Sequence, residues 1–322
     1  MTGHLNQRYV HRNPFFYLVN LLKRVLINSR ASKLQKIIDK LDNVCTHPDL
    51  NLPKEPPVNV NDITKEASWA EHSSSKFLFL GHFIDAALAH DIHVIIMVKR
   101  GRTMKIIENY FLGKGFALRL TPSSDDSDSS EMIFYRDKLS FGVRTTSDEQ
   151  AFESFRPPAL IIALDSTFNP QNESVKLLRE KSIPGILIPV VRLVISNTCE
   201  HLRLCAHDCP DDIKSRLLVA NAKRISDTVG ELQDDALGVQ EDAEEILGYL
   251  TADPASRKWP LAYIEILDIH IPETNHLVAE VEQLRSTASS GQKRILVSCI
   301  LSKPRKPVVL TLPCELVGRR RR

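Results

Sequence analysis

The feature that most constrains the fold is an alternation of short apolar runs with stretches of helical periodicity. Four apolar runs stand out, and they read IHVIIMV, FALRLT, ALIIALD and GILIPVVRLV. Each is rich in residues that favour strands and too short for a typical helix. Segments with apolar residues at three- and four-residue spacing lie between them. This alternation predicts an α/β fold, a parallel sheet with helices on both faces. We expect it to contain the strands Val94–Val98, Ala117–Leu120, Leu160–Leu164 and Leu187–Val191.

The rest of the chain is expected to flank this α/β lobe. We predict five parts: a basic helical segment (1–50), a linker (51–73), the lobe (74–208), a helical extension (209–260) and a part with strands and a basic tail (261–322). In the last part the runs LAYIEILDIHI, RILVSCIL and PVVLTLP have the composition of strands. A loop is expected around residues 123–147, because PSSDDSDSS contains no core-forming residue.

Composition and charge narrow the class of protein. The 322 residues are 43% hydrophobic and 25% charged, which is enough apolar material for a core. The six cysteines in so long a chain do not indicate a disulfide framework, so we expect a reducing compartment. We expect no membrane association, because no apolar run reaches the roughly 18 residues of a membrane span. The net charge is only +2, yet residues 1–40 hold eight Lys or Arg and one acid, whereas residues 225–250 hold eight acids and no Lys or Arg.

Several motifs occur in the order seen in one class of DNA-dependent ATPase. Residues 41–50 read LDNVCTHPDL, residues 165–173 read DSTFNPQNE, and residues 192–202 read RLVISNTCEHL. Together with the helix and strand pattern of residues 74–122, these segments resemble the second RecA-like lobe of Swi/Snf-type remodelling ATPases. The resemblance covers about residues 35–205, and it implies a RecA-like version of the α/β fold.

The residues that would contact ATP depart from the pattern of these ATPases. No G-x-x-x-x-G-K-[ST] loop for phosphate occurs in the chain. The family places two arginines after the signature aspartate, at positions that are Arg179 and Ser182 here. The Gly-Gly loop before the signature strand is missing as well, since no glycine occurs between Gly142 and Gly185. We therefore predict a lobe that does not hydrolyse ATP, without catalytic residues or cofactors. Asp165, Asn169 and Pro170 are then expected to hold the turn and the start of the next helix.

A degenerate lobe of this kind is similar to the non-catalytic subunits 2 and 3 of the fungal class II histone deacetylase complex. The resemblance implies a nuclear protein that binds duplex DNA or nucleosomes and acts in transcriptional repression. It also implies two protein partners, the catalytic deacetylase subunit and a paralogous subunit. In that family a downstream coiled coil assembles the complex, and no long heptad run follows residue 260 here.

Two groups of basic residues are candidates for contacts with DNA phosphates, which require clustered positive charge and little sequence information. The first lies in the N-terminal segment, and the second follows the strand Val94–Val98 directly; the candidates are Arg24, Arg30, Lys33, Lys36, Lys99, Arg100 and Arg102. The alternative is that these residues are ordinary solvated charges. The runs KPRK (303–306) and RRRR (319–322) are compatible with nuclear import, nucleic-acid binding or a basic tail.

Three further alternatives stay open from the sequence. The acidic residues 225–250 form a solvated face or a site for a basic partner. A zinc site could be built from Cys199, His201, Cys205, His207 and Cys209, but the segment has no C-x-x-C pair, so we expect no metal. For the whole chain, the second lobe of an active remodeller and a structural adaptor that binds only protein compete with the deacetylase-complex subunit.

Overall fold

A computed structural model of the chain describes residues 31–53, 62–120, 132–146, 156–180, 187–206, 211–225, 238–253, 259–260, 267, 269 and 307–312. The chain divides into two compact units. One is the helical unit, residues 1–51, 196–234 and 266–303, and the other is the sheet unit, residues 52–195, 235–265 and 304–322.

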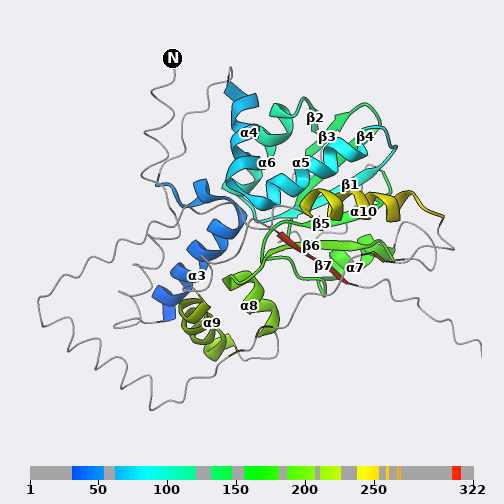
Figure 1. The fold of residues 1–322 in the computed structure, drawn as a ribbon. Coiled ribbons are helices and arrows are strands. Elements are labelled where there is room, and N and C mark those ends of the chain that lie inside the picture. Colours follow the sequence, from blue (N-terminus) through cyan, green and yellow to red (C-terminus); the bar gives the residue numbers. More distant parts are fainter. Residues whose placement is uncertain are drawn as a thin grey trace, which may run out of the picture. The chain divides into compact units, whose positions relative to one another are not determined.

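The sheet unit is built on a sheet of seven strands in the order β2-β3-β4-β1-β5-β6-β7 (Figure 1). The strands are β1 (His93–Val98), β2 (Ala117–Leu120), β3 (Met132–Arg136), β4 (Leu139–Thr145), β5 (Leu160–Ala163), β6 (Val190–Ile195) and β7 (Pro307–Leu312). The four central strands, β4, β1, β5 and β6, are parallel to one another. The predicted α/β class is therefore confirmed, and the centre of the sheet is parallel as predicted.

The edges of the sheet differ from the purely parallel sheet that the sequence predicts. Strand β2 pairs antiparallel with β3, which pairs antiparallel with β4. At the other edge, β7 pairs antiparallel with β6. The prediction of a strand in PVVLTLP is confirmed by β7. The strand predicted at Leu187–Val191 begins later, because β6 starts at Val190. It follows Pro189, whose carbonyl accepts the Ile161 amide.

The expected loop around residues 123–147 is wrong in its second half, which forms the hairpin of β3 and β4. The two strands are joined at Asp137 and Lys138, and Asp137 has a φ of 53°. Aspartate tolerates this left-handed conformation better than most residues, so the turn forms without the glycine that usually marks a hairpin. The acidic residues before the hairpin hid the strand signal of MIFYR.

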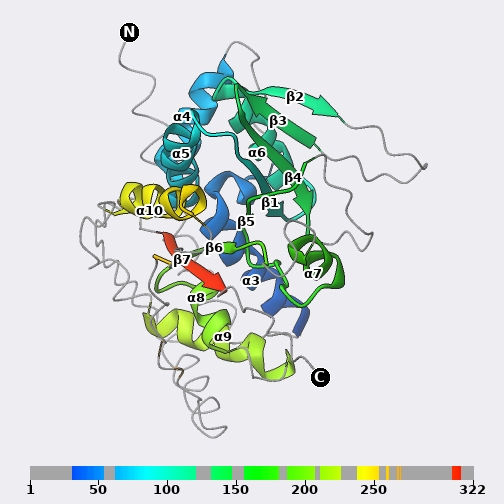
Figure 2. The same ribbon diagram turned by 90° about the vertical axis from the view of Figure 1, so that its right-hand side faces the viewer.

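Residues of β1, β5 and β6 alternate between two apolar cores, one on each face of the sheet. Val94, Ile96 and Val98 of β1 face a core shared with four helices, and Ile95 and Met97 face the other. The four helices are α4 (Ile63–Ser73), α5 (Ser75–Ala87), α6 (Arg102–Gly113) and α10 (Val239–Thr251), and α7 (Glu173–Glu180) covers the opposite face (Figure 2). Helices on both faces agree with the prediction.

Helix α4 occupies much of the segment 51–73 that the sequence predicts to be a linker. It packs against α5 and α6 through small residues, and Ala67 and Ala70 are buried. The contact with α6 is close, because a Cβ added at Gly113 would lie 2.4 Å from the Ile63 carbonyl oxygen. A helix that packs through alanines carries a weak apolar pattern, which explains why the sequence does not indicate it.

The helical unit contains α3 (Ala31–Thr46), the 3-10 helix η1 (Pro48–Asn51), α8 (Cys199–Cys205) and α9 (Asp211–Ile225). A single apolar cluster joins the three α-helices, with Ile38 of α3, Leu202 of α8 and Val219 of α9 among its buried members. The predicted helices after residue 30 and after residue 210 are confirmed. The strands predicted in LAYIEILDIHI and RILVSCIL lie outside the described residues, apart from isolated positions. No described helix has the length and apolarity of a membrane span.

Candidate nucleic-acid interface

The carboxyl ends of the central strands lie at one edge of the sheet, because these strands are parallel. The strand order reverses at β1, which has β4 on one side and β5 on the other. In open α/β sheets, ligands bind outside the carboxyl ends of strands at such a reversal. The candidate cations Lys99, Arg100 and Arg102 follow β1 at this point, so we call residues 99–102 the basic loop.

The basic loop is anchored to the next strand by the signature aspartate. Asp165 is buried, and its Oδ2 accepts a hydrogen bond from the Lys99 backbone N–H. Its other carboxylate oxygen, Oδ1, accepts from the Thr167 backbone N–H at 2.9 Å and from the Thr167 hydroxyl. The Thr167 hydroxyl in turn lies 2.7 Å from that of Thr146, just after β4. One carboxylate therefore ties the loops after β1 and β5 together.

A buried lysine lies directly behind this carboxylate, and sequence reasoning missed it. Lys76 of α5 is fully buried, and its Nζ donates to the Leu164 carbonyl oxygen at 2.7 Å. Residues preceding Asp165 are thus held from the helix side as well. The only signal in the sequence is that this lysine directly precedes the apolar run FLFL at the start of α5.

The cations of the basic loop differ in exposure. Lys99 and Arg100 are exposed, and Gly101 has a φ of +101°, a conformation that favours glycine. The half-buried Arg102 donates from Nη1 to the Leu52 carbonyl oxygen, so it also has a structural contact. The loop therefore presents two exposed cations at the carboxyl edge of the sheet, immediately before α6.

The residues after Asp165 form a turn that leads into α7. The Asn169 side-chain oxygen accepts from the Gln171 N–H at 3.0 Å, and Pro170 lies within the turn. The Asn172 side-chain oxygen accepts from the Ser174 N–H at 3.1 Å, at the start of the helix. These contacts are those of side chains that stabilise a turn and a helix start.

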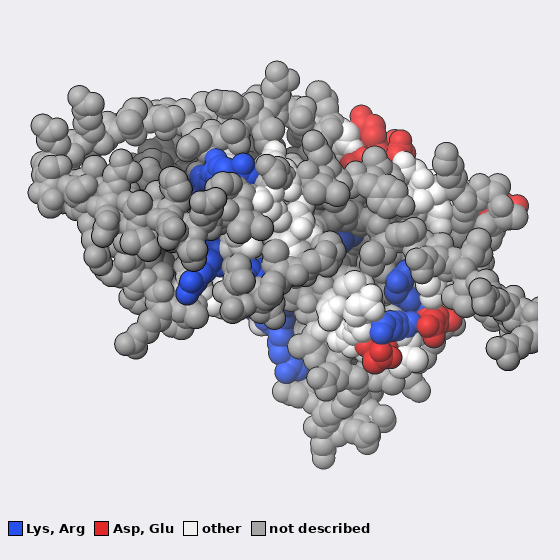
Figure 3. Space-filling view, turned by 90° about the horizontal axis from the view of Figure 1, so that it is seen from below, with Lys and Arg blue, Asp and Glu red and all other residues white. Residues whose placement is uncertain are grey.

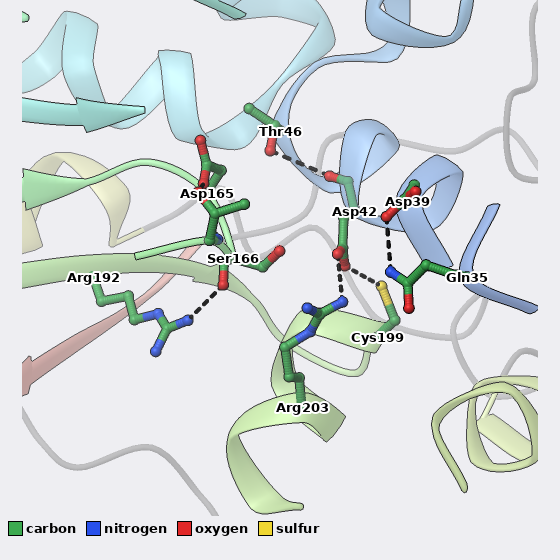
Figure 4. Close-up of polar contacts among 10 residues, drawn as sticks. Gln35, Asp39, Asp42, Thr46, Asp165, Ser166, Arg192, Cys199 and Arg203 are labelled. Atoms are coloured by element: carbon green, nitrogen blue, oxygen red, sulfur yellow. Dashed lines mark hydrogen bonds and ion pairs between the residues drawn. The ribbon is translucent and has the colours of Figure 1, made fainter. Parts of the chain in front are cut away.

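Arg179, the arginine retained at the position of an ATPase arginine, binds the backbone of its own unit. Its Nε donates to the Ile188 carbonyl oxygen at 3.0 Å, and its backbone carbonyl accepts from the Ile188 N–H at 2.9 Å. Arg192 of β6 likewise donates to the Ser166 carbonyl oxygen at 3.3 Å (Figure 4). Ser182, the second position, lies outside the described residues.

The N-terminal candidates belong to the helical unit. Lys36 is exposed on α3, and Lys33 lies on the same helix, within the described backbone only. Arg24 and Arg30 lie outside the described residues. Figure 3 shows Lys and Arg side chains in several small groups on the described part of one face, with acidic side chains beside one of them.

Two buried histidines have pKa values far below the ordinary value of 6.5. Burial, together with the smaller effect of the nearby positive charge of Arg156, lowers the pKa of His93 to about 4; its Nδ1 lies 2.9 Å from the Ser140 hydroxyl. Burial also lowers the pKa of His47 to about 4, against the opposing effect of the Asp49 carboxylate. Both imidazoles are therefore neutral near pH 7, and neither supplies charge for binding an anion.

Residues 199–209 contain the cysteines and histidines considered for a zinc site. Among the residues that the structure describes, no three His, Cys, Asp or Glu side chains form a group suited to a metal ion. Cys199 donates to Asp42 at 3.1 Å, and the ring Nδ1 of His201 accepts from the Asn197 N–H at 3.2 Å. The Cys205 sulfur accepts from the Leu267 N–H at 3.3 Å. His207 and Cys209 lie outside the described residues.

The sequence of this chain matches a known protein family. The model of the family "Class II histone deacetylase complex subunits 2 and 3" matches residues 14–250. The chain belongs to this family. The match runs from before α3 to α10, so it includes the basic loop and the Asp165 turn, whereas β7 lies beyond it.

A curated relative agrees with this assignment. HDA1 complex subunit 3 of Saccharomyces cerevisiae is 25% identical over 173 residues, which are 50% of this chain and 25% of that protein. The chain therefore spans about a quarter of the length of the curated relative it matches.

Two solved structures share the fold. A chain from structural and functional studies of the yeast class II Hda1 HDAC complex superposes with a TM-score of 0.62 at 20% identity, covering 84% of this chain and 93% of that one. A chain from the crystal structure of fission yeast Ccq1 and Tpz1 gives 0.51 at 16% identity, covering 79% and 88%. At these identities the likeness is one of fold.

Proposed function

We propose that this protein is a non-catalytic, DNA-binding subunit of a class II histone deacetylase complex and acts in transcriptional repression in the nucleus. The observation that carries the proposal is the family match over residues 14–250, which spans the motif segments 41–50, 165–173 and 192–202. Its protein partners in this proposal are the catalytic deacetylase subunit and a paralogous subunit. Duplex DNA or the nucleosome is its nucleic-acid partner.

A structural role for the ATPase-like residues supports a non-enzymatic function. Stabilising a transferring phosphoryl group requires arginine side chains directed at the phosphate. Arg179 instead donates from Nε to a carbonyl oxygen of its own unit, and Asp165 accepts hydrogen bonds from the backbone N–H groups of Lys99 and Thr167. These are the contacts of a scaffold in which the turn is retained and the chemistry has been lost.

The basic loop supports the DNA-binding part of the proposal. Lys99 and Arg100 are exposed at the carboxyl edge of the sheet, and the Asp165 carboxylate fixes the backbone at Lys99. Contacts with phosphate from such cations position a duplex without reading its sequence. Binding should therefore show little sequence preference, and affinity should fall with salt by a slope of about −0.9 per phosphate contact.

An electrophoretic shift titration of one duplex at several salt concentrations tests the DNA interface. Replacing Lys99 and Arg100 together by Ala should weaken binding of all duplexes alike and make the salt slope shallower by up to about 2. Arg102 is left intact because it also donates to the Leu52 carbonyl.

The matched control for this experiment removes two lysines from other elements. Lys65 of α4 pairs with Asp62 at 2.6 Å, and Lys176 of α7 pairs with Glu173 at 2.9 Å. Changing both to Ala removes the same charge and should leave the slope nearly unchanged. If the unmodified protein gives no shift even at low salt, the DNA-binding proposal fails and a protein-only adaptor becomes the better function.

Membership of a deacetylase complex requires a separate test. The full chain, co-expressed with a class II deacetylase catalytic subunit and a paralogous subunit, should co-purify with both, and the Lys99 and Arg100 double variant should do so equally well. Co-purification without DNA binding would support the adaptor alone. Absence of co-purification with either protein, from a folded chain, would contradict the assignment to the complex.

A further inference from the structure

Two thiols of the helical unit lie against each other, and the function proposed above does not use them. Cys45 lies in the last turn of α3, and Cys199 is the first residue of α8. Both are free cysteines. Cys199 Sγ lies 3.1 Å from Oδ1 of Asp42, which is three residues before Cys45 on α3 and therefore on the same face of that helix. Cys45 also packs against the apolar cluster of which Cys199 is a buried member. Helices distant in sequence thus bring the two thiols into one side-chain cluster.

The surroundings of the two thiols are unequal. Cys199 is buried, and its Sγ donates to Oδ1 of Asp42 at 3.1 Å; the other oxygen of Asp42 is paired with the Arg203 guanidinium (Figure 4). The neighbouring Cys45 thiol, followed by burial, raises the pKa of the Cys199 thiol well above its usual value. Cys45 is only half-buried. An oxidant that arrives from solvent therefore meets Cys45 first, because reactivity follows exposure and thiolate character.

We propose that Cys45 and Cys199 form a reversible disulfide when the protein meets a peroxide, with Cys45 as the attacking thiol and Cys199 as the resolving thiol. The Cys45 thiol loses its proton, the thiolate attacks the peroxide and the O–O bond breaks; Cys45 becomes a sulfenic acid, and the leaving hydroxide or alkoxide takes up the proton and departs as water or alcohol. The Cys199 sulfur then attacks the Cys45 sulfur. An S–S bond forms, the S–O bond breaks, and hydroxide leaves with the Cys199 proton as water. Two electrons pass from the thiols to the peroxide.

Asp42 is placed to assist the second step. Its carboxylate already accepts the hydrogen bond from the Cys199 Sγ–H, and Arg203 holds that carboxylate in position. Loss of the Cys199 proton in the direction of Asp42 makes the sulfur nucleophilic. The disulfide would join the end of α3 to the start of α8, and reduction by a dithiol would restore both cysteines. Transient disulfides of this type are compatible with a reducing compartment.

Peptide mapping of the full chain by mass spectrometry, after a graded hydrogen peroxide treatment and without reductant, tests the proposal. The expected result is a cross-linked pair of peptides containing Cys45 and Cys199, lighter by about 2 Da than the two separate peptides. Dithiothreitol should remove the cross-link. Dimedone, which traps sulfenic acid, should label Cys45 about tenfold more in the Cys199→Ser variant than in the unmodified protein, because no resolving thiol is left.

Control variants separate this pair from general oxidation. In Cys45→Ser, Cys199 should stay unmodified at doses that oxidise Cys45 in the unmodified protein. Cys205→Ser, which changes a third cysteine of the same helical unit, should retain the cross-link. Equal dimedone labelling of Cys45 with and without Cys199 would overturn the proposal, as would cross-links from Cys45 mainly to other cysteines. If a variant fails to fold, the peptide map of the unmodified protein decides alone.

Discussion

At the residue scale, buried polar groups give this protein a stability that should depend on pH. The pKa of His93 is about 4 in the folded chain and near 6.5 when unfolded, so the unfolded state takes up the proton more readily. The neutral His93 side chain contributes fully to stability at pH values above 6.5, the pKa in the unfolded chain. This contribution is lost progressively as the pH falls from that value toward about 4, the pKa in the folded chain. We expect the free energy of unfolding to decrease by about 2 kcal/mol for this histidine between about pH 7.5 and about pH 5.

Chemical denaturation at a series of pH values measures this effect. The variant His93→Asn keeps a polar partner for Ser140 but removes the titration, so the loss of stability on acidification should be smaller by that amount. His72 is exposed on α4, and His72→Asn is the control for replacing a histidine at the surface. An identical pH dependence in His93→Asn and the unmodified protein would show that the imidazole is not the group responsible.

Asp165 is a second residue whose role can be tested through stability. Its carboxylate accepts from the backbone N–H groups of Lys99 and Thr167, so Asp165→Ala leaves both donors without this acceptor. We expect a loss of about 1–3 kcal/mol in the free energy of unfolding. Asp165→Asn retains one acceptor oxygen and should lose less. Equal stability of the alanine variant and the unmodified protein in urea titrations would refute the structural role.

Contacts within a turn can be predicted from the sequence, whereas contacts between distant segments cannot. An aspartate after a buried strand and before an Asn-Pro turn is recognisable from local chemistry, so the structural interpretation of Asp165 and Asn169 could be reached from the sequence. The contacts of Lys76 and Arg102 could not. Each donates to a carbonyl on a segment far away in the chain, Leu164 and Leu52, and the partner is set by packing rather than by spacing.

At the scale of elements, close helix packing makes one glycine much less replaceable than another. A Cβ at Gly113 of α6 would lie 2.4 Å from the Ile63 carbonyl oxygen and 2.7 Å from the Ala67 Cβ, so α4 would have to shift. We expect Gly113→Ala to cost about 1–3 kcal/mol of stability. At Gly248, inside α10, a Cβ would meet nothing within 4 Å, and Gly248→Ala should stabilise by about 0.5–1 kcal/mol.

Thermal unfolding of the two glycine variants decides whether α4 is part of the packed unit. A lower midpoint for Gly113→Ala and a higher one for Gly248→Ala are expected. If Gly113→Ala also raised the midpoint, α4 would not be packed on α6 as described. This matters because α4 lies where the sequence predicts a linker.

The elements that the sequence predicts correctly share a strong local pattern. Strands β1 and β5 are continuous apolar runs, which buried parallel strands require. The hairpin of β3 and β4 was missed because an acidic stretch precedes it and no glycine marks its turn at Asp137. The antiparallel pairing of β7 with β6 is a contact between distant segments, and no local pattern encodes it.

At the scale of the whole molecule, the two compact units contain different candidate sites. The sheet unit contains the basic loop and the ATPase-like turn, and the helical unit contains Lys36 and the thiol pair. The net charge of +2 excludes a uniformly basic chain, so the proposed DNA binding requires local groups of cations. The two exposed cations of the basic loop form such a group. The α/β fold alone does not assign a function, which has to be inferred from the residues at the candidate site.

The protein as a whole is therefore expected not to hydrolyse ATP, with or without duplex DNA. No phosphate-binding G-x-x-x-x-G-K-[ST] loop occurs in this chain, and Ser182 stands where the Swi/Snf-type pattern that the sequence resembles has an arginine. Arg179 donates to the Ile188 carbonyl oxygen, a contact that turns it toward its own backbone. A phosphate-release assay on the purified chain should give only background. Turnover that is abolished by Arg179→Ala but retained in Lys176→Ala would contradict this expectation, because it would assign a catalytic role to an arginine that here supports the start of β6.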